Sequence, residues 1–189
     1  MPVASFSTCS LVIANTPSAM RKIEFTELQQ NPAELIGKQW MLITAGTPDS
    51  FNCMTASWGG LGFLWNRPVA FVFVRPNRYT AKFIDEQASF TLSFMPEKYR
   101  ADLIFCGRNS GRDVDKMAAT SLRPMTTEGG LPAMKDADVV IECRKMAVVT
   151  MQETDFVDFS EVSPQWYDPT NPLHKVYICE ISASYVRDL

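Results

Sequence analysis

Residues 69–80 read VAFVFVRPNRYT, a strand pattern followed directly by a helix pattern. Residues 69–75 are rich in β-branched and aromatic side chains, and Pro68 and Pro76 enclose them, which is typical of a strand. The sequence NRYTAKFIDEQ at 77–87 predicts a helix that begins between Asn77 and Thr80. We therefore expect a strand that is followed directly by the N-terminus of a helix.

The rest of the chain contains mostly short strand patterns. Further strands are expected at 40–46, 51–58, 89–94, 138–149 and 174–182, and short helices at 96–106 and 113–119. Segment 89–94 alternates apolar and polar side chains, which predicts a half-buried strand. The pair Gly59-Gly60 is expected to break the chain, and the proline-rich segment 162–173 is expected to form a loop or lid. Many short strands and few helices predict an antiparallel barrel rather than a βαβ sheet.

Composition and charge exclude several classes of protein. The chain has 189 residues, of which 46% are apolar, and a formal net charge of −3. Its length predicts one domain, at 20–189, and its charge argues against a nucleic-acid surface, which needs a basic face. No apolar run approaches the ~20 residues of a membrane helix. Residues 1–19 lack the features of a secretory signal, so we expect a flexible extension there, with Met20 as an alternative start.

The cysteines and the lone histidine argue against a metal site. The five cysteines are scattered and form no C-x-x-C pair, and His174 is the only histidine. Structural zinc needs about four clustered ligands. Scattered cysteines are instead typical of reduced, buried thiols in a cytoplasmic protein. Neither common glycine-rich loop for nucleotide phosphates is present.

The stretch NCMTASWGG at 52–60 combines an amide, hydroxyls and exposed backbone on one strand. A flat heteroaromatic ligand needs such edge hydrogen bonds and a close backbone approach. Strand alternation predicts Asn52, Met54, Ala56 and Trp58 on one side, and Cys53, Thr55 and Ser57 on the other. The alternative interpretation is a plain strand that ends in a glycine-rich turn.

Two further stretches have the chemistry of an anion site. In RPNRYT at 75–80, a helix N-terminus offers free N–H groups, and Arg78 adds a planar donor fork. A second possible anion site is SGRDVDK at 110–116, where Lys116 supplies the positive charge. Asp113 and Asp115 are expected to cap a helix there. Each stretch alone is also explained as a capped helix or a solvated loop. His174 is more often structural than catalytic in such a position, and no Ser/His/Asp or Cys/His set can be assembled.

Five stretches together resemble one known family. They are N-x-M-T-x-S-W-G-G at 52–60, R-P-N-R-Y-T at 75–80, F-T-L-S-F at 90–94, C-G-x-x-S-G-R-D-V-D-K at 106–116 and H-K-V-Y-I-C-E-I at 174–181. They resemble the flavin reductase-like family, related to flavoredoxin, over roughly residues 21–185. The resemblance implies a mainly β fold with short helices: a split antiparallel β-barrel of the Greek-key, FMN-binding type. It also implies a homodimer with FMN near the interface.

The resemblance assigns cofactor-binding residues. Those along the isoalloxazine ring and ribityl chain would be Asn52, Met54, Thr55, Ser57 and Trp58. Those at the phosphate would be Arg78, Tyr79 and Thr80, completed by Ser110, Gly111 and Lys116. Flavin reductases of the wider superfamily often carry Gly-Asp-His before the last strand, whereas residues 171–174 read NPLH here. Only the histidine is kept, which favours the flavoredoxin-like branch.

The resulting hypothesis is an FMN-dependent oxidoreductase with no protein residue as acid or base. Electrons would come from NADH or NADPH and pass to a flavin, a protein or a small acceptor. Trp58, Trp166, Tyr167 and His174 would shape the open face of the ring. The alternatives are an FMN-binding electron carrier without NAD(P)H activity, a barrel with a vacated site, and a thiol enzyme using Cys53 or Cys106.

Overall fold

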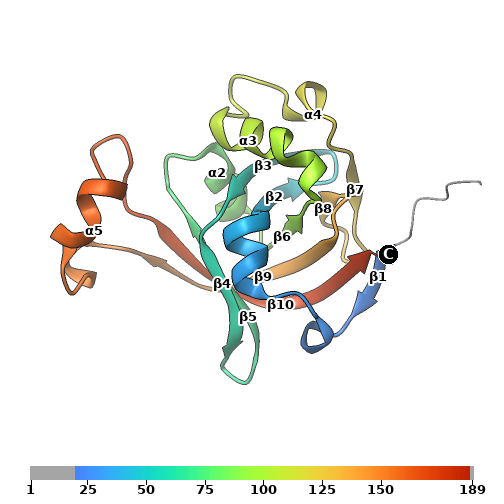
Figure 1. Cartoon of the computed structure of the whole chain (residues 1–189), viewed down its shortest axis with the longest axis horizontal. Coiled ribbons are helices and arrows are strands. Elements are labelled where there is room, and N and C mark those ends of the chain that lie inside the picture. Colours follow the sequence, from blue (N-terminus) through green and yellow to red (C-terminus); the bar gives the residue numbers. More distant parts are fainter. Residues whose placement is uncertain (1–19, 188–189) are drawn as a thin grey trace, which may run out of the picture.

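Antiparallel strands dominate residues 20–187, the part of the chain that the computed structural model describes (Figure 1). The strands are β1 (Met20–Ile23), β2 (Met41–Thr47), β3 (Ser50–Ala56), β4 (Gly59–Leu64), β5 (Arg67–Val74), β6 (Ser89–Phe94), β7 (Pro124–Thr126), β8 (Pro132–Met134), β9 (Val139–Thr150) and β10 (Lys175–Arg187). The helices are α1 (Pro32–Glu34), α2 (Tyr79–Glu86), α3 (Arg100–Arg108), α4 (Lys116–Ala119) and α5 (Phe159–Trp166), with shorter helical turns at Phe25–Glu27, Leu35–Gln39, Glu97–Tyr99 and Glu153–Asp155. The predicted extension at 1–19 lies outside the described residues. No helix between residues 20 and 187 is long and apolar enough to cross a membrane.

The main sheet closes on itself because of one short link. Its strand order is β3-β2-β6-β9-β10-β5-β4, with β1 paired to β10, so β3 and β4 lie at opposite ends. Only Ser57 and Trp58 separate these two strands along the chain, and such a link spans about 11 Å at most. The sheet must therefore curl until its two edges meet. Within residues 20–187 no ladder joins β3 to β4, so the barrel remains split along this line, which we call the seam.

The connection from β5 to β6 brings α2 to the seam. These strands follow one another in the chain, but β9 and β10 lie between them in the sheet, which is typical of a Greek-key connection. Gly59 pairs with Val72, so the end of β5 lies beside the start of β4. Helix α2 follows that end of β5 and therefore begins near the seam. The predicted split antiparallel β-barrel with short helices is confirmed.

The structure has two apolar clusters: one fills the barrel and the other covers part of its outer surface. The inner cluster includes Ile43, Val72, Ile84, Phe90, Phe94, Ile141 and Tyr177. The outer cluster packs α3 and β8 against the barrel and includes Leu42, Leu103, Cys106, Met134 and Tyr185. Strand β6 lies between them and is buried on both faces, so the expectation of a half-buried strand at 89–94 is wrong. Its polar face is satisfied locally, because Thr91 Oγ1 donates to the Pro132 carbonyl at 2.6 Å and the Met134 N–H donates to Ser93 Oγ at 3.2 Å.

Several predicted boundaries need correction. Segment 162–173 is not entirely a loop, because α5 extends to Trp166 with Pro164 inside it. Asp158 caps this helix by accepting from the N–H groups of Ser160 and Glu161. The helix expected at 113–119 begins only at Lys116. The Asp115 side chain caps it by accepting hydrogen bonds from the backbone N–H groups of Met117 and Ala118.

Gly59 and Gly60 do not break the chain, because they open strand β4. Gly59 has φ +150°, and a Cβ atom placed on it would lie 2.6 Å from the carbonyl oxygen of Phe71. Side-chain-bearing residues rarely adopt this backbone conformation. The glycine therefore allows the chain to leave the β3–β4 link and pair with β5 immediately.

We expect Gly59→Ala to lower the free energy of unfolding by about 2 kcal/mol or more, because the methyl group meets backbone in a strained conformation. Gly62→Ala, in the same strand, is the control, since no atom lies within 4 Å of its added Cβ. That control should change the stability by less than about 0.5 kcal/mol. Denaturant unfolding of both variants checks this, and equal midpoints would contradict it.

Candidate functional site

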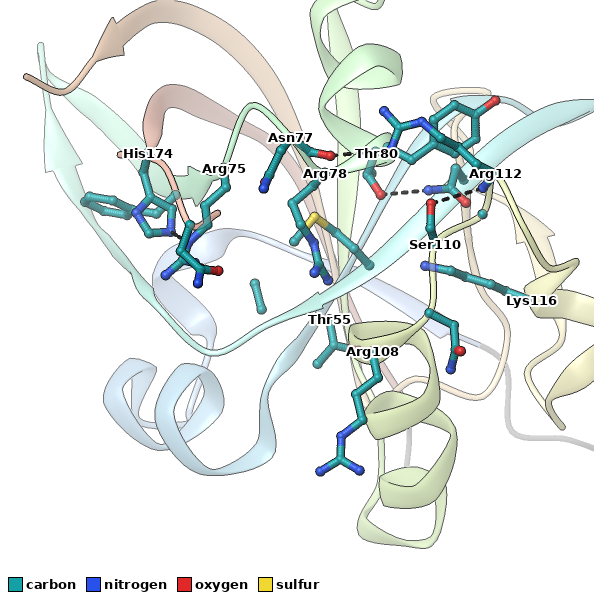
Figure 2. Close-up of a pocket in the computed structure, with 18 of the residues that line it drawn as sticks. Thr55, Arg75, Asn77, Arg78, Thr80, Arg108, Ser110, Arg112, Lys116 and His174 are labelled. Atoms are coloured by element: carbon teal, nitrogen blue, oxygen red, sulfur yellow. Dashed lines mark hydrogen bonds between the residues drawn. The ribbon is translucent and has the colours of Figure 1, made fainter. Parts of the chain in front are cut away.

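A cavity of about 350 Å³ lies at the seam, within the range of small-molecule sites. It is bounded by the end of β3, the β3–β4 link, the end of β5, the start of α2, the loop after α3, and residues just before β10 (Figure 2). Every residue that the sequence predicted to bind a cofactor lines it: Asn52, Met54, Thr55, Ser57, Trp58, Arg78, Tyr79, Thr80, Ser110, Gly111 and Lys116. Segments far apart in the sequence are thus brought together as expected.

Of the three predicted lid residues, only His174 lines the cavity. Trp166 and Tyr167 lie behind it: the Trp166 ring meets Trp58 edge-on at 4.7 Å, and the Tyr167 hydroxyl lies 3.1 Å from His174 Nδ1. The alternation rule also fails here, because Thr55 and Ser57 line the same cavity as Met54. Strand β3 is an edge strand at the seam, so the cavity is lined by residues from both of its faces.

Several other lining residues were not among the predicted cofactor-binding residues. They are Ala56, Phe73, Arg75, Asn77, Arg108, Asn109, Arg112 and Asn171. A signal for two of them was present, because alternation predicts Phe73 and Arg75 on one face of the strand expected at 69–75. No local pattern points to Asn171, which reaches the cavity only through the fold of the segment before β10.

The N-terminus of α2 forms one side of the cavity. Arg78 is its N-cap residue and makes no side-chain capping bond, so no side chain at this position occupies the first N–H groups. Asn52 Nδ2 donates to Thr80 Oγ1 at 2.8 Å, which leaves the Thr80 hydroxyl proton free to donate. Arg78 itself donates to the Gly107 carbonyl. This arrangement provides donors for an anion at a positive helix end.

The charge of the cavity is entirely positive. Arg75, Arg78, Arg108, Arg112 and Lys116 line it, and no Asp or Glu does, although the whole chain is acidic. Burial and the nearby charge of Arg75 lower the pKa of Arg78, and burial lowers the pKa of Lys116. Cations that lower one another's pKa are stabilised by a bound anion.

Lys116 also ties the site together. Its ammonium group donates to the carbonyl oxygens of Cys53 at 2.6 Å and Cys106 at 2.9 Å, so it joins β3 to α3. An ammonium group has a third donor, which can serve a ligand. Gly111 packs closely against β3, because a Cβ atom placed on it would lie 2.0 Å from Asn52 Oδ1. The loop at 110–112 therefore lies directly on β3.

The other end of the cavity is aromatic and uncharged apart from Arg75. His174 is only 4% exposed, and Arg75 Nε donates to its Nε2 at 3.4 Å. Burial, and next the charge of Arg75, lower the pKa of His174 to about 4. The imidazole is therefore neutral at physiological pH. Trp58 lies beside it, with ring centroids 5.4 Å apart.

The thiols of Cys53 and Cys106 do not line the cavity. Cys53 and Cys106 are 1% and 0% exposed, with their sulfur atoms 3.9 Å apart. The hydrogen bond with Cys106 and burial both raise the pKa of Cys53. Reactive cysteines are normally partly exposed thiolates, so the geometry argues against thiol chemistry. Among residues 20–187 no three His, Cys, Asp or Glu side chains form a group that could hold a metal ion.

The single histidine, His174, is expected to make the free energy of unfolding depend on pH. Its folded pKa of about 4 lies below the ordinary value of 6.5, so between these values the unfolded chain takes up a proton that the folded protein excludes. The stabilisation is complete above pH 6.5 and is lost as the pH falls towards 4. We expect the free energy of unfolding to fall by about 2 kcal/mol from pH 7 to pH 5.

Denaturant unfolding at several pH values measures this loss. His174→Asn should flatten the dependence between pH 7 and pH 5, because the chain has no other histidine. An equal slope in both proteins would show that His174 is not the group responsible.

Comparison with known proteins identifies the family. A family model described as flavin reductase like domain matches residues 34–188. The structure is similar to flavoredoxin from Methanosarcina acetivorans (22% identity, 79% of this chain and 69% of that chain, TM-score 0.62). It is also similar to an FMN-binding domain of flavin reductases-like enzyme from Shewanella baltica (14% identity, 91% of this chain and 79% of that chain, TM-score 0.66). A third similar structure is an NADH:FAD oxidoreductase from Streptomyces globisporus (13% identity, 79% of this chain and 75% of that chain, TM-score 0.60). The comparison with curated proteins gave no match.

The match to the family model extends from the turns before β2 to the end of β10, and therefore includes all the predicted cofactor-binding residues. The three similar structures have the same split-barrel fold. The chain belongs to the flavin reductase-like family.

Proposed function

We propose that this protein is an FMN-dependent oxidoreductase of the flavin reductase or flavoredoxin type. It would accept electrons from NADH or NADPH and pass them to a flavin, a protein or a small acceptor. The observation that carries the proposal is the cavity at the seam, which combines unbalanced positive charge at the start of α2 with neutral aromatic side chains at its other end. FMN has the matching chemistry: an anionic phosphate and a flat, uncharged ring system.

The residues present fit FMN. A phosphate monoester carries about −1.5 to −2 charges, and the cations around the start of α2 would balance it. Arg78, Tyr79 and Thr80 would hold it, with Thr80 Oγ1 and the free helix N–H groups as donors. Ser110, Gly111 and Lys116 would complete the contacts to the phosphate and the ribityl chain. Arg112, stacked on Tyr79 at 4.8 Å, would add to the positive potential.

The ring would lie towards Asn52, Met54, Thr55, Ser57 and Trp58. Bound FMN would supply the capacity to accept and release hydride or electrons. Backbone and small side chains of the β3–β4 link would hydrogen-bond the ring edge. His174, neutral and buried, would exclude water from this end of the cavity without supplying charge. No side chain there is required as a general acid or base.

The alternative is an FMN-binding electron carrier that does not oxidise NAD(P)H. One observation favours it: both ring nitrogens of His174 already have partners, Arg75 and Tyr167, so this histidine is not free to bind a nicotinamide nucleotide. Anaerobic addition of NADH or NADPH to the flavin-loaded protein separates the two proposals. Loss of the oxidised flavin absorbance supports the reductase, and no change supports the carrier.

We further propose that the protein is a cytoplasmic homodimer with FMN near the interface. The exposed aromatic side chains Phe63 and Trp65 follow the β3–β4 link on the β4–β5 hairpin, 66% and 56% exposed, and a second copy would cover them. The free thiols among the described residues, Cys53, Cys106, Cys143 and Cys179, are all buried, which suits a reducing compartment.

Removing the Arg78 guanidinium tests the phosphate assignment. We expect Arg78→Met to raise the Kd for FMN by about 10- to 100-fold, because one charge-assisted hydrogen bond is worth about 1.5–3 kcal/mol. Riboflavin has the same ring without the phosphate, so its affinity should change by less than about threefold. Fluorescence titration with both flavins measures the difference.

Arg123→Met is the matched control. It removes the same charge from an exposed arginine that pairs with Asp136 outside the cavity. This variant should bind both flavins as the wild type does. The phosphate assignment fails if Arg78→Met binds FMN normally, or if it loses FMN and riboflavin equally.

A further inference from the structure

We propose that Arg75 is a positioning residue that holds residues 159–174, here called the lid, across the aromatic end of the cavity. The proposal rests on the proposed flavin function for its kinetic consequence, but the contact itself is independent of any ligand. Arg75 directly follows β5, so its backbone belongs to the barrel wall. In Figure 2 its side chain lies beside His174, with Arg78 between it and Ser110 and Lys116.

The Arg75 guanidinium bonds the lid at three separate points. Nε donates to His174 Nε2 at 3.4 Å, Nη2 donates to the Trp166 carbonyl at 2.8 Å, and Nη1 donates to Asn171 Oδ1. The guanidinium carbon also lies 5.9 Å from the ring centroid of Trp58 and 5.8 Å from that of Tyr167. One barrel side chain therefore contacts the end of α5, the turn that follows it and the residue before β10.

The part of the lid before His174 has little else to hold it. Helix α5 has no buried residue, and Figure 1 shows it standing away from the barrel beyond the ends of β9 and β10. Its aromatic contacts among Phe156, Phe159 and Tyr167 lie within residues 151–174. In the described chain, the side-chain hydrogen bonds from the barrel to residues 152–171 come from Arg75 and from Asn77, which donates to the Thr170 carbonyl at 3.0 Å.

The acceptor groups are oriented to receive a guanidinium. Asn171 Nδ2 donates to Asp168 Oδ2 at 2.7 Å, which turns the amide oxygen towards Arg75. The Tyr167 hydroxyl contacts the other ring nitrogen of His174. A planar fork reaches several acceptors at once, whereas an ammonium group is a compact charge on a flexible stem. Lysine at this position would keep the charge but lose most of the bonding.

The lid uses three of the five N–H donors of Arg75, so the guanidinium is held at the lid and not at the start of α2. The aromatic end of the cavity is lined by the uncharged rings of Trp58 and His174, and the uncharged Trp166 ring packs against Trp58. Trp58 and Trp166 are 38% and 41% exposed and in contact with one another. We infer that the reacting group of the electron donor or acceptor is a flat, uncharged, conjugated ring, and that Arg75 fixes the walls that receive it.

Hydrogen–deuterium exchange of the flavin-free protein tests the positioning role without any ligand. The amides of Tyr167 and Asn171 are hydrogen-bonded within the lid and report on its order. In Arg75→Met we expect exchange in peptides covering 159–174 to accelerate about tenfold, and in Arg75→Lys by nearly as much. Peptides from β9 and β10 should be unchanged, which shows that the variants are folded.

Arg108→Met is the matched control, because Arg108 lines the same cavity but its side chain makes no hydrogen bond or ion pair within residues 20–187. It removes the same charge and should leave exchange in the lid unchanged. If Arg75→Met and Arg75→Lys exchange as the wild type does, or if Arg108→Met accelerates the lid equally, the positioning role is wrong.

Steady-state kinetics of the flavin-loaded protein tests the consequence. In Arg75→Lys we expect the KM for NADH or NADPH, or for an electron acceptor with a conjugated ring, to rise about tenfold, with the Kd for FMN within about threefold of wild type. A raised exchange rate with unchanged KM would overturn the claim that the lid receives the second ligand. A protein that binds no flavin would instead overturn the proposed function, and the exchange result would still decide the role of Arg75.

Discussion

The two-residue link between β3 and β4 determines how the barrel closes and where its cavity lies. It joins the two ends of a sheet that would otherwise stay open, and so forces closure into a barrel with one unpaired seam. Gly59 makes this possible, because its missing side chain lets β4 pair with β5 immediately after the link. The antiparallel register then brings the end of β5, and with it the start of α2, to the same corner.

The seam would be unstable if it were only a gap between strands, and two cations, the buried Lys116 and the half-buried Arg78, bond the backbone around it. Lys116 bonds the backbone of β3 to that of α3, while Arg78 bonds the C-terminal end of α3. Both carry charge that no carboxylate along the cavity balances. Stability at this corner and affinity for an anion are therefore linked, since a ligand phosphate would relieve the repulsion that the folded chain otherwise retains.

Much of the site was predictable because it lies in local motifs. The strand end at 52–58, the helix start at 78–80 and the loop at 110–116 each carry a recognisable set of donors, and the fold brings them together. Where alternation alone was applied, it failed: Thr55 shares the cavity with Met54 because β3 is an edge strand. The prediction that strand β6 is half-buried was wrong for a related reason, since its polar residues form hydrogen bonds with β8 inside the protein.

The residues that sequence reasoning missed depend on tertiary structure. Arg75 gains its partners only because residues 166–174 fold back over the end of β5, and Pro164 gives no sign that it lies inside a helix. Asn171 is reached through a turn that Asp168 stabilises. These contacts join segments about 90 residues apart in sequence, and no local pattern encodes them.

The visible absorption spectrum of the purified protein, with the released chromophore identified by mass, is the decisive measurement for FMN binding at the seam. We expect a two-band flavin spectrum and a chromophore with the mass of FMN. A colourless protein that remains colourless after incubation with FMN would contradict it. The similarity to flavoredoxins would then extend to the fold alone, and the cationic cavity at the seam would require a different anionic ligand.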